Sequence, residues 1–309
     1  MIEVDNLTKY YGTKIALDKV SFTVRKGEVL GFLGPNGAGK STAMKIITCY
    51  LSPTEGSVKV DGLDVFDDSL EVRKRIGYLP ETPPLYLDMT VKNYLEFAAK
   101  IKGVDKKNLQ ESVDTVVDKC GLSQYYRSQC RALSKGFRQR VGIAQAMVHN
   151  PLVLILDEPT IGLDPIQIVE IRHLIKSFGG EHTVVLSTHI LPEVDMTCER
   201  VIIINDGTVV AEDTTSNLRS RLPQTEQIYL EIRGNSSQLL SKLEAIQGIN
   251  SVNEDKCSDN IIIYEIKADN KTDVRPEIAK TVIGENLELL QLKDVSLTLE
   301  DIFINVTMK

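Results

Sequence analysis

The chain has 309 residues, of which 42% are hydrophobic and 26% charged, a composition typical of a folded protein with one large or two unequal domains. Its formal net charge of -7 argues against a general nucleic-acid-binding protein, because affinity for a phosphate backbone comes from clustered Lys and Arg. The N-terminal residues are acidic and no apolar run follows them, so we expect no secretory signal and a cytoplasmic protein. No stretch approaches the roughly 20 apolar residues of a membrane-spanning helix, so we expect any membrane role to come from a partner.

The cysteines lie far apart and form no C-x-x-C pair. This spacing favours neither a disulfide framework nor a zinc site, so we interpret them as buried thiols and expect no metal cluster. They are Cys49, Cys120, Cys130, Cys198 and Cys257.

The first elements alternate between apolar and polar residues. Residues 2–11 and 16–24 have this period of two, which predicts strands of a partly antiparallel sheet at the front of the domain. The next strand, residues 28–34, is almost continuously apolar, as expected of a central strand that is buried on both faces.

A glycine-rich loop follows that strand and precedes a predicted helix. Its sequence GPNGAGKST fits the pattern G-x-x-x-x-G-K-[ST], and its position between strand and helix supports a phosphate-binding loop. Lys40 can reach the β- and γ-phosphates of a nucleotide, Ser41 can ligate Mg²⁺, and the helix N-terminus attracts anions. The predicted nucleotide-binding residues of the loop are Gly34, Pro35, Asn36, Gly37, Ala38, Gly39, Lys40, Ser41 and Thr42.

Between about residues 85 and 150 the spacing of apolar residues becomes helical, which predicts a helical insertion within the α/β domain. The positions expected on the buried face of the first helix are Val91, Tyr94 or Leu95, Ala98 and Ile101.

Two acidic residues end the apolar strand at residues 152–158. An acid at the carboxyl end of a buried strand lies beside the phosphate loop in sheets of this kind. We therefore expect Asp157 to orient Mg²⁺, directly or through water, and Glu158 to accept a proton from the attacking water or hold that water in line.

Strands and helices alternate to about residue 220, which predicts an α/β domain over residues 1–220. The remaining residues, 222–309, predict a small α+β domain with the order β-α-β-β-α-β of the ferredoxin-like arrangement. A closing amphipathic helix is expected at residues 297–307.

The segment LSKGFRQR, residues 133–140, resembles the signature segment of ATP-binding cassette (ABC) proteins, usually written LSGGQ. The resemblance implies a P-loop NTPase fold with a mixed sheet, an antiparallel β subdomain and a helical insertion. It also implies that Ser134 and the Gly136 amide contact ATP bound by an opposite subunit, in a homodimer or paired cassette with ATP sandwiched between its members. Lys135 and Arg138 depart from the family pattern and either add positive charge to the site or are only solvated charges.

Further residues match the family in order. Tyr11 stands where an aromatic residue stacks on adenine, with Tyr10 as the alternative. Asp164 matches the loop that crosses between subunits, and His189 matches the histidine that contacts the γ-phosphate, which makes it a catalytic candidate with Glu158 and Lys40. Glu81 replaces the usual glutamine and is predicted to contact Mg²⁺ with a full charge.

The resemblance extends to ABC-2-type exporter ATPases of the gliding-motility and multidrug or sodium-extrusion groups. It implies an ATPase on the inner face of a bacterial membrane that powers a separate integral membrane permease, without nucleic acid. An importer ATPase is one alternative, and a non-transport cassette that acts on nucleic acid or the ribosome is another. Closure of the dimer on ATP is expected to move a groove formed by the segment after Glu81 and the helices near Tyr86 to Lys102, and a permease helix is expected to follow this groove. Tyr86, Leu87 and Met89 are either partner contacts or core residues.

Overall fold

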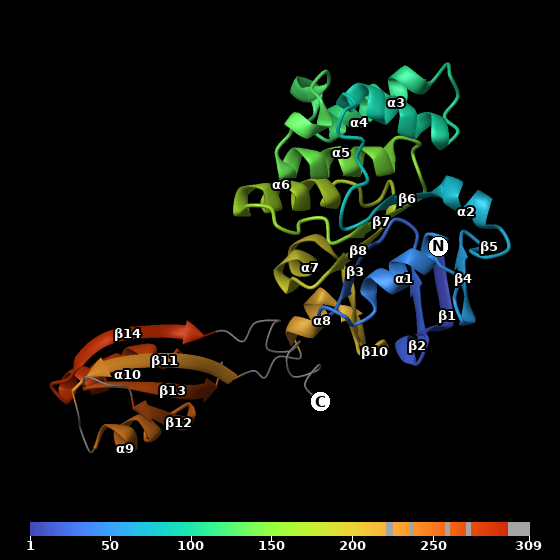
Figure 1. Cartoon of the computed structure of the whole chain (residues 1–309). Helices are drawn as coiled ribbons and strands as arrows, with labels where there is room; N and C mark the ends of the chain where they lie inside the picture. Colours follow the sequence, from blue (N-terminus) through green and yellow to red (C-terminus); the bar gives the residue numbers. More distant parts are fainter. Residues whose placement is uncertain (221–224, 235–237, 257–259, 270–272, 296–309) are drawn as a thin grey trace. The chain divides into compact units, whose positions relative to one another are not determined.

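The computed structural model describes residues 1–220, 225–234, 238–256, 260–269 and 273–295 (Figure 1). The chain forms two compact units, of which the first covers Met1–Thr215 and the second begins at Ser216. Each unit has its own core. None of the helices in the described ranges is both long and apolar enough to cross a membrane.

The first unit contains a six-stranded sheet with the order β10-β9-β3-β8-β7-β6. All neighbours are parallel except β10, which returns antiparallel to β9 through a turn at Asp206 and Gly207. Every residue of β3, β7 and β8 is buried, which for β3 and β7 confirms the prediction of central strands covered on both faces. The strands are β3 (Val29–Leu33), β6 (Ile76–Leu79), β7 (Val153–Asp157), β8 (Thr183–Thr188), β9 (Arg200–Asn205) and β10 (Thr208–Thr214).

The register of this sheet positions the site. Leu33 pairs with Thr188, and Asp157 pairs with Ser187, so β3, β7 and β8 end at one edge. The segments that follow these strands therefore begin side by side, although they are far apart in the sequence.

A second, antiparallel sheet has the order β2-β1-β4-β5, as the alternating pattern predicted. It shares a hydrophobic core with the parallel sheet, and the Phe22 and Phe32 rings meet with their centroids 5.3 Å apart. Tyr11 and Lys14 pair at the tip of its first hairpin, where Gly12 takes a φ of 59°. The strands are β1 (Ile2–Tyr11), β2 (Lys14–Val24), β4 (Glu55–Val60) and β5 (Leu63–Asp64).

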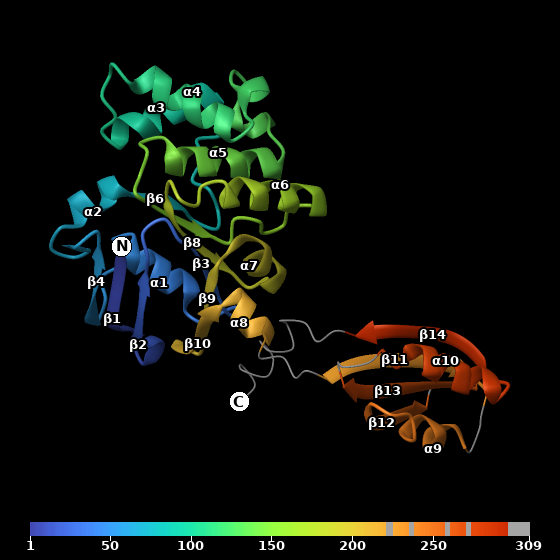
Figure 2. The same cartoon turned by 180° about the vertical axis from the view of Figure 1, so that it is seen from behind.

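Helices α3, α4 and α5 lie together at one end of the first unit in both views (Figures 1 and 2). The prediction that Ile101 lies on the buried face of α3 is wrong, because its side chain is 67% exposed. A period of 3.6 residues carries that face through Ala98 and Ala99 to Lys102 instead. The helices are α1 (Lys40–Ile47), α2 (Ser69–Arg75), α3 (Val91–Ile101), α4 (Leu109–Lys119), α5 (Lys135–Met147), α6 (Pro165–Lys176), α7 (Leu191–Thr197) and α8 (Thr215–Ser220), with 3₁₀ turns at Ser123–Tyr125 and Cys130–Ala132.

The second unit has the element order β-α-β-β-α-β and an antiparallel sheet with the order β12-β13-β11-β14. Alternate residues of β11 and β13, such as Leu230 and Tyr264, are buried in its core. The helix expected at residues 297–307 lies outside the described residues. The elements are β11 (Thr225–Arg233), α9 (Leu239–Glu244), β12 (Ile249–Lys256), β13 (Ile261–Asp269), α10 (Arg275–Gly284) and β14 (Glu288–Val295).

The cysteines within the described ranges are free thiols. Cys120, Cys130 and Cys198 are buried as predicted, whereas Cys49 is only half-buried. Cys257 lies outside the described residues.

Candidate functional site

The loop from Gly34 to Thr42 connects β3 to α1 and takes a shape that requires glycine. Gly39 has a φ of 106°, and a Cβ there would lie 2.5 Å from the Ala16 carbonyl oxygen. A Cβ on Gly34 would lie 2.4 Å from the Ile204 carbonyl oxygen. Gly39 also begins α1 without a side-chain cap, so the first amides of the helix are left for a ligand.

Lys40 is 6% exposed, and its ammonium group faces the inside of the loop. Its Nζ donates to the Gly34 carbonyl at 2.8 Å and to the Pro35 carbonyl at 3.1 Å. It also lies 3.4 Å from Glu158 Oε1, so the cation is shared between the loop and the acidic end of β7.

Asp157 ends β7 and is buried. It accepts hydrogen bonds from the Ser187 hydroxyl at 2.8 Å and from Ser41. Burial raises the pKa of the Asp157 carboxyl, whereas these hydrogen bonds and the charge of Lys40 favour its ionised form. Ser41 and Asp157 are neighbours, as their positions after β3 and at the end of β7 predicted. Ser187 was not predicted, because its role depends on the register of β7 against β8.

Glu158 takes a left-handed conformation, with a φ of 49°, and its amide donates to the Ser187 carbonyl at 2.9 Å. This turn directs the carboxylate at two partners. Oε1 faces Lys40, and Oε2 lies 2.9 Å from Nδ1 of His189. The Glu158 side chain is 7% exposed and the His189 side chain 35% exposed, so the imidazole links a buried carboxylate to solvent.

A cleft of about 550 Å³ opens above the loop. Tyr11, 49% exposed, lies on its wall and Tyr10 does not, so the structure favours Tyr11 between the two candidates. Glu81 is exposed and also lines this cleft. Lys14, Ala16 and Ile161 also line the cleft and were not predicted as site residues. The full lining is Tyr11, Lys14, Ala16, Asn36, Gly37, Gly39, Lys40, Ser41, Thr42, Glu81, Glu158 and Ile161.

The donors in and beside this cleft suit Mg²⁺. Across the described part of the chain, no group of three or more His, Cys, Asp or Glu side chains is arranged to hold a metal ion by itself. Mg²⁺ bound with a nucleotide needs only one or two protein oxygens besides phosphate and water. Ser41 and Asp157 already adjoin, and Glu81 faces the same cleft.

The segment 134–138 lies outside the lining of this cleft. Ser134 caps α5, and its hydroxyl accepts a hydrogen bond from the Phe137 amide at 3.4 Å. Gly136 is buried against Gln167, because a Cβ there would lie 2.5 Å from that side chain. Arg138 donates to the Cys130 carbonyl at 3.2 Å and to the Arg131 carbonyl at 2.7 Å, so its guanidinium group is used within the chain.

Asp164 is exposed at the start of α6 and is also absent from the cleft lining. Its Oδ1 accepts a hydrogen bond from the Gln167 amide at 2.9 Å and so caps that helix. The starts of α5 and α6 thus meet at Gln167, which both Gly136 and Asp164 contact.

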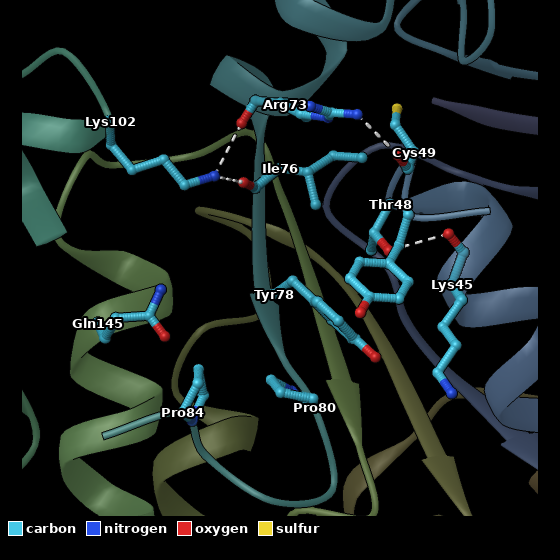
Figure 3. A pocket seen from close by; sticks show the side chains of 11 residues that line it. Lys45, Thr48, Cys49, Arg73, Ile76, Tyr78, Pro80, Pro84, Lys102 and Gln145 are labelled. Carbon is cyan, nitrogen blue, oxygen red and sulfur yellow. Dashed lines mark hydrogen bonds between the residues drawn. The ribbon is translucent and has the colours of Figure 1, made fainter. Parts of the chain in front are cut away.

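A separate cavity of about 620 Å³ lies between α1, β6 and α5 (Figure 3). The Tyr78 hydroxyl and Gln145 Oε1 are buried there without a hydrogen-bond partner among the described residues. Lys102 donates to the carbonyls of Arg73 and Ile76, each at 2.9 Å, and burial followed by the charge of Arg73 lowers its pKa. The lining is Lys45, Thr48, Cys49, Tyr50, Arg73, Ile76, Tyr78, Pro80, Pro84, Lys102 and Gln145.

The predicted groove after Glu81 lies partly in this cavity, which includes Pro84 and Lys102. Tyr86 and Leu87 are 55% and 46% exposed, respectively, so they are surface residues. The Tyr86 ring packs edge-on against Phe97 with centroids 5.4 Å apart, which fixes its orientation on α3.

The chain is similar to known proteins in sequence and in fold. Residues 17–161 match a family model described as ABC transporter. The chain is 33% identical to the uncharacterised ABC transporter ATP-binding protein YhcH of Bacillus subtilis (strain 168), over 99% of this chain and 96% of that protein. It is 38% identical to the bacitracin transport ATP-binding protein BcrA of Bacillus licheniformis, over 75% of this chain and 74% of that protein.

Among solved structures, it is similar to the dimeric bacterial ABC transporter cassette MJ0796, with a TM-score of 0.64 and 30% identity over 70% of this chain and 99% of that cassette. The same cassette has been solved in a post-hydrolysis state bound to ADP and Pi.

Proposed function

The chain belongs to the ABC transporter family as an ATP-binding subunit with ATPase activity, and from this premise we propose that two copies hydrolyse ATP between them to drive a separate membrane permease. The observation that carries the proposal is Glu158, which is held inside the phosphate-loop cleft between Lys40 and His189.

We assign the roles within one subunit as follows. The loop amides and Lys40 bind the phosphates, and Tyr11 stacks on the adenine ring. Glu158 orients the attacking water and takes its proton, while His189 contacts the γ-phosphate and keeps Glu158 in place. Ser41, Asp157 and Glu81 would hold Mg²⁺, which when bound neutralises charge on the phosphates.

The proposal requires a second copy, because Ser134, Gly136 and Asp164 do not line the cleft of their own chain. The backbone amides at the N-terminus of α5 offer an anion-binding surface to the γ-phosphate of ATP on an opposing subunit. The dimeric state of the MJ0796 cassette supports this arrangement.

The permease is proposed to dock at the cavity of Figure 3. Its lining combines apolar side chains with the unpaired Tyr78 hydroxyl and Gln145 carbonyl, which suits an amphipathic peptide segment that carries its own donors and acceptors. Tyr50 is 74% exposed at this cavity and offers an aromatic anchor. Docking there would place the chain at the cytoplasmic face of a membrane.

We propose export as the direction of transport, supported by the likeness to a bacitracin transport subunit. Purifying the chain from cells together with its bound partners distinguishes export from the importer and non-transport functions. Recovery of a substrate-capture protein with the complex would favour import, and recovery of nucleic acid or ribosomes would favour the non-transport class.

Mixing two inactive variants tests the shared site. Lys40→Ala removes the phosphate contact, and Ser134→Asp keeps the helix cap while placing a negative charge toward the opposing γ-phosphate. Each variant alone should hydrolyse ATP very slowly, whereas the mixture should regain activity, because the intact loop of one partner meets the intact Ser134 of the other. Ser134→Asn, which caps the helix without charge, is the matched control and should retain more activity than Ser134→Asp. No recovery in a mixture that forms mixed dimers would contradict the shared site.

Docking is tested by Tyr50→Ala in cells that produce the natural permease. Loss of a central aromatic anchor should weaken membrane association by about 10-fold or more. The measurement is the fraction of the chain that sediments with membranes, with Leu70→Ala as a control because Leu70 is also strongly exposed, at 71%, but does not line the cavity. Equal membrane recovery for both variants would argue against docking at this cavity.

A further inference from the structure

Glu193 on α7 is a completely buried acid that belongs to none of the motifs, with 0% of its surface exposed. Its carboxylate accepts hydrogen bonds from the Thr160 hydroxyl and, at 2.8 Å, from the Thr188 hydroxyl. Arg172 lies 3.8 Å away and provides the nearest positive charge that the structure records for it. Because burial of an acid is costly unless its oxygens are satisfied, this arrangement depends on both threonines.

Both threonines adjoin the reacting pair. Thr160 follows Glu158 by two residues, and Thr188 directly precedes His189. Since Glu158 and His189 meet at 2.9 Å, Glu193 ties together the two segments that carry them.

The anchored segments need this restraint. Glu158 has a φ of 49°, a conformation that costs free energy for a residue with a side chain and persists only where its surroundings hold it. Neighbouring bonds extend the anchor, because Thr188 Oγ1 accepts from the Ile190 amide at 3.0 Å and the Thr160 carbonyl accepts from the Leu163 amide at 3.2 Å.

The helix that carries Glu193 is itself firmly seated. A Cβ on Gly31 of β3 would lie 2.6 Å from Val194 Cγ1, so α7 packs directly on the backbone of the central strand. That strand leads into the phosphate loop, and the Gly34 amide donates to the Thr188 carbonyl at 3.3 Å. Glu193 therefore connects the catalytic pair to the same rigid strand that positions the phosphates.

We propose that Glu193 is a positioning residue for ATP hydrolysis, which holds Thr160 and Thr188 so that Glu158 and His189 keep their mutual geometry. The inference rests on the roles proposed above for Glu158 and His189. Glu193 contacts neither nucleotide nor water in this role. Its loss should therefore lower kcat while the binding of ATP by the loop is kept.

Thr160→Val and Thr188→Val in the full-length chain remove the two hydroxyl groups and keep the side-chain shape, and Glu193→Gln keeps the shape of the acid. Each should lower kcat on the order of 10-fold, because small displacements of catalytic groups are costly, with KM for ATP changed by less than about two-fold. Thr183→Val is the matched control, since Thr183 is 1% exposed at the other end of β8 and accepts from the Gly27 amide at 3.0 Å. A kcat loss in Thr183→Val equal to that in Thr188→Val would overturn the proposal.

A double-mutant test distinguishes positioning from general stability. In a His189→Ala background, Thr188→Val should change kcat by less than about two-fold, because the group that it positions is already gone. The same fold-loss in both backgrounds would overturn the inference. If Glu193→Gln fails to fold, Thr160→Val and Thr188→Val still test whether Glu193 positions the catalytic pair. Near-normal hydrolysis by Glu158→Gln would refute the proposed function, whereas an inactive Glu158→Gln beside fully active threonine variants would refute only the role of Glu193.

Discussion

Replacing Glu158 with glutamine keeps the size of the side chain and removes its charge and its ability to accept a proton. The amide can still lie against His189, so the cleft should keep its shape. We expect kcat to fall by about 10²- to 10⁴-fold, the usual contribution of a general base, which corresponds to about 3–5 kcal/mol in the barrier.

ATP affinity should not fall with it. Lys40 Nζ and Glu158 Oε1 lie 3.4 Å apart, and at an effective dielectric constant of about 20 their gross Coulomb attraction is about 5 kcal/mol before desolvation is counted. Both side chains are buried, so solvent screens this attraction little. Without the carboxylate, the ammonium group is released toward the phosphates, and the variant should bind MgATP at least as tightly as the original chain and accumulate as an ATP-dependent dimer.

The assay combines phosphate release in a single turnover, equilibrium binding of MgATP and size-exclusion chromatography with and without ATP. Glu181→Gln is the matched control, because Glu181 also pairs with a lysine, Lys119 at 3.0 Å, but on the surface. Hydrolysis by Glu158→Gln within about two-fold of the Glu181→Gln rate would refute the reasoning, because removing a general base costs far more. Loss of ATP binding would refute the predicted release of Lys40 toward the phosphates, but not the role of Glu158 as general base.

Three further outcomes follow from the structure. Gly39→Ala should weaken ATP binding by 10-fold or more, and Gly37→Ala should weaken it by less. Both glycines have a positive φ, but only Gly39 lacks space for a Cβ. Isothermal titration with MgATP compares the Kd values of the two variants. Tyr11→Ala should raise the Kd for ATP by roughly 5- to 150-fold, the equivalent of about 1–3 kcal/mol of base stacking, whereas Tyr11→Phe should not; equal effects would exclude stacking. Arg200→Met should lower the free energy of unfolding by about 3–5 kcal/mol near pH 7, because it leaves Glu28 buried without its partner. Burial opposes ionisation of Glu28, but the hydrogen bond and charge of Arg200 lower its pKa overall below 4.5. The stabilisation from this ion pair is therefore present above that pH and is lost as pH falls through the folded pKa. Denaturant unfolding of the original chain and of Arg200→Met from pH 7 to pH 3 should show the difference in their free energies of unfolding shrinking.

The phosphate loop was predictable because its chemistry is local. Gly34, Lys40 and Ser41 act within one continuous segment, and the apolar strand before them identifies the sheet. Glu158 and His189 were predicted one at a time, from the strand ends and the family pattern. Their contact depends on the register that pairs Asp157 with Ser187.

Residues joined only by tertiary packing were not predictable. Glu193 stands in a short helix with no periodic signal, and its partners lie 33 and 5 residues away along the chain. Thr160 and Thr188, which stand near Glu158 and His189 in the sequence, could have suggested a hydrogen-bonded acid. They do not indicate which acid it is. Ile101 was placed wrongly because the last step of three residues turns it about 60° away from Ala98 around the helix, whereas the step of four residues to Lys102 returns to the buried face.

Gln167 gives the first unit an unexpected mechanical property. Its side chain fills the space beside Gly136, and its backbone amide donates to the Asp164 carboxylate. The starts of α5 and α6, which are proposed to reach the partner's ATP, are therefore joined before any partner arrives. Local opening in proteins often involves neighbouring segments that move as one cooperative unit. In hydrogen exchange, the first amides of α5 and α6 should therefore lose protection as one unit. The Gln167 side chain thus determines how rigidly this chain holds the residues that it contributes to the shared site.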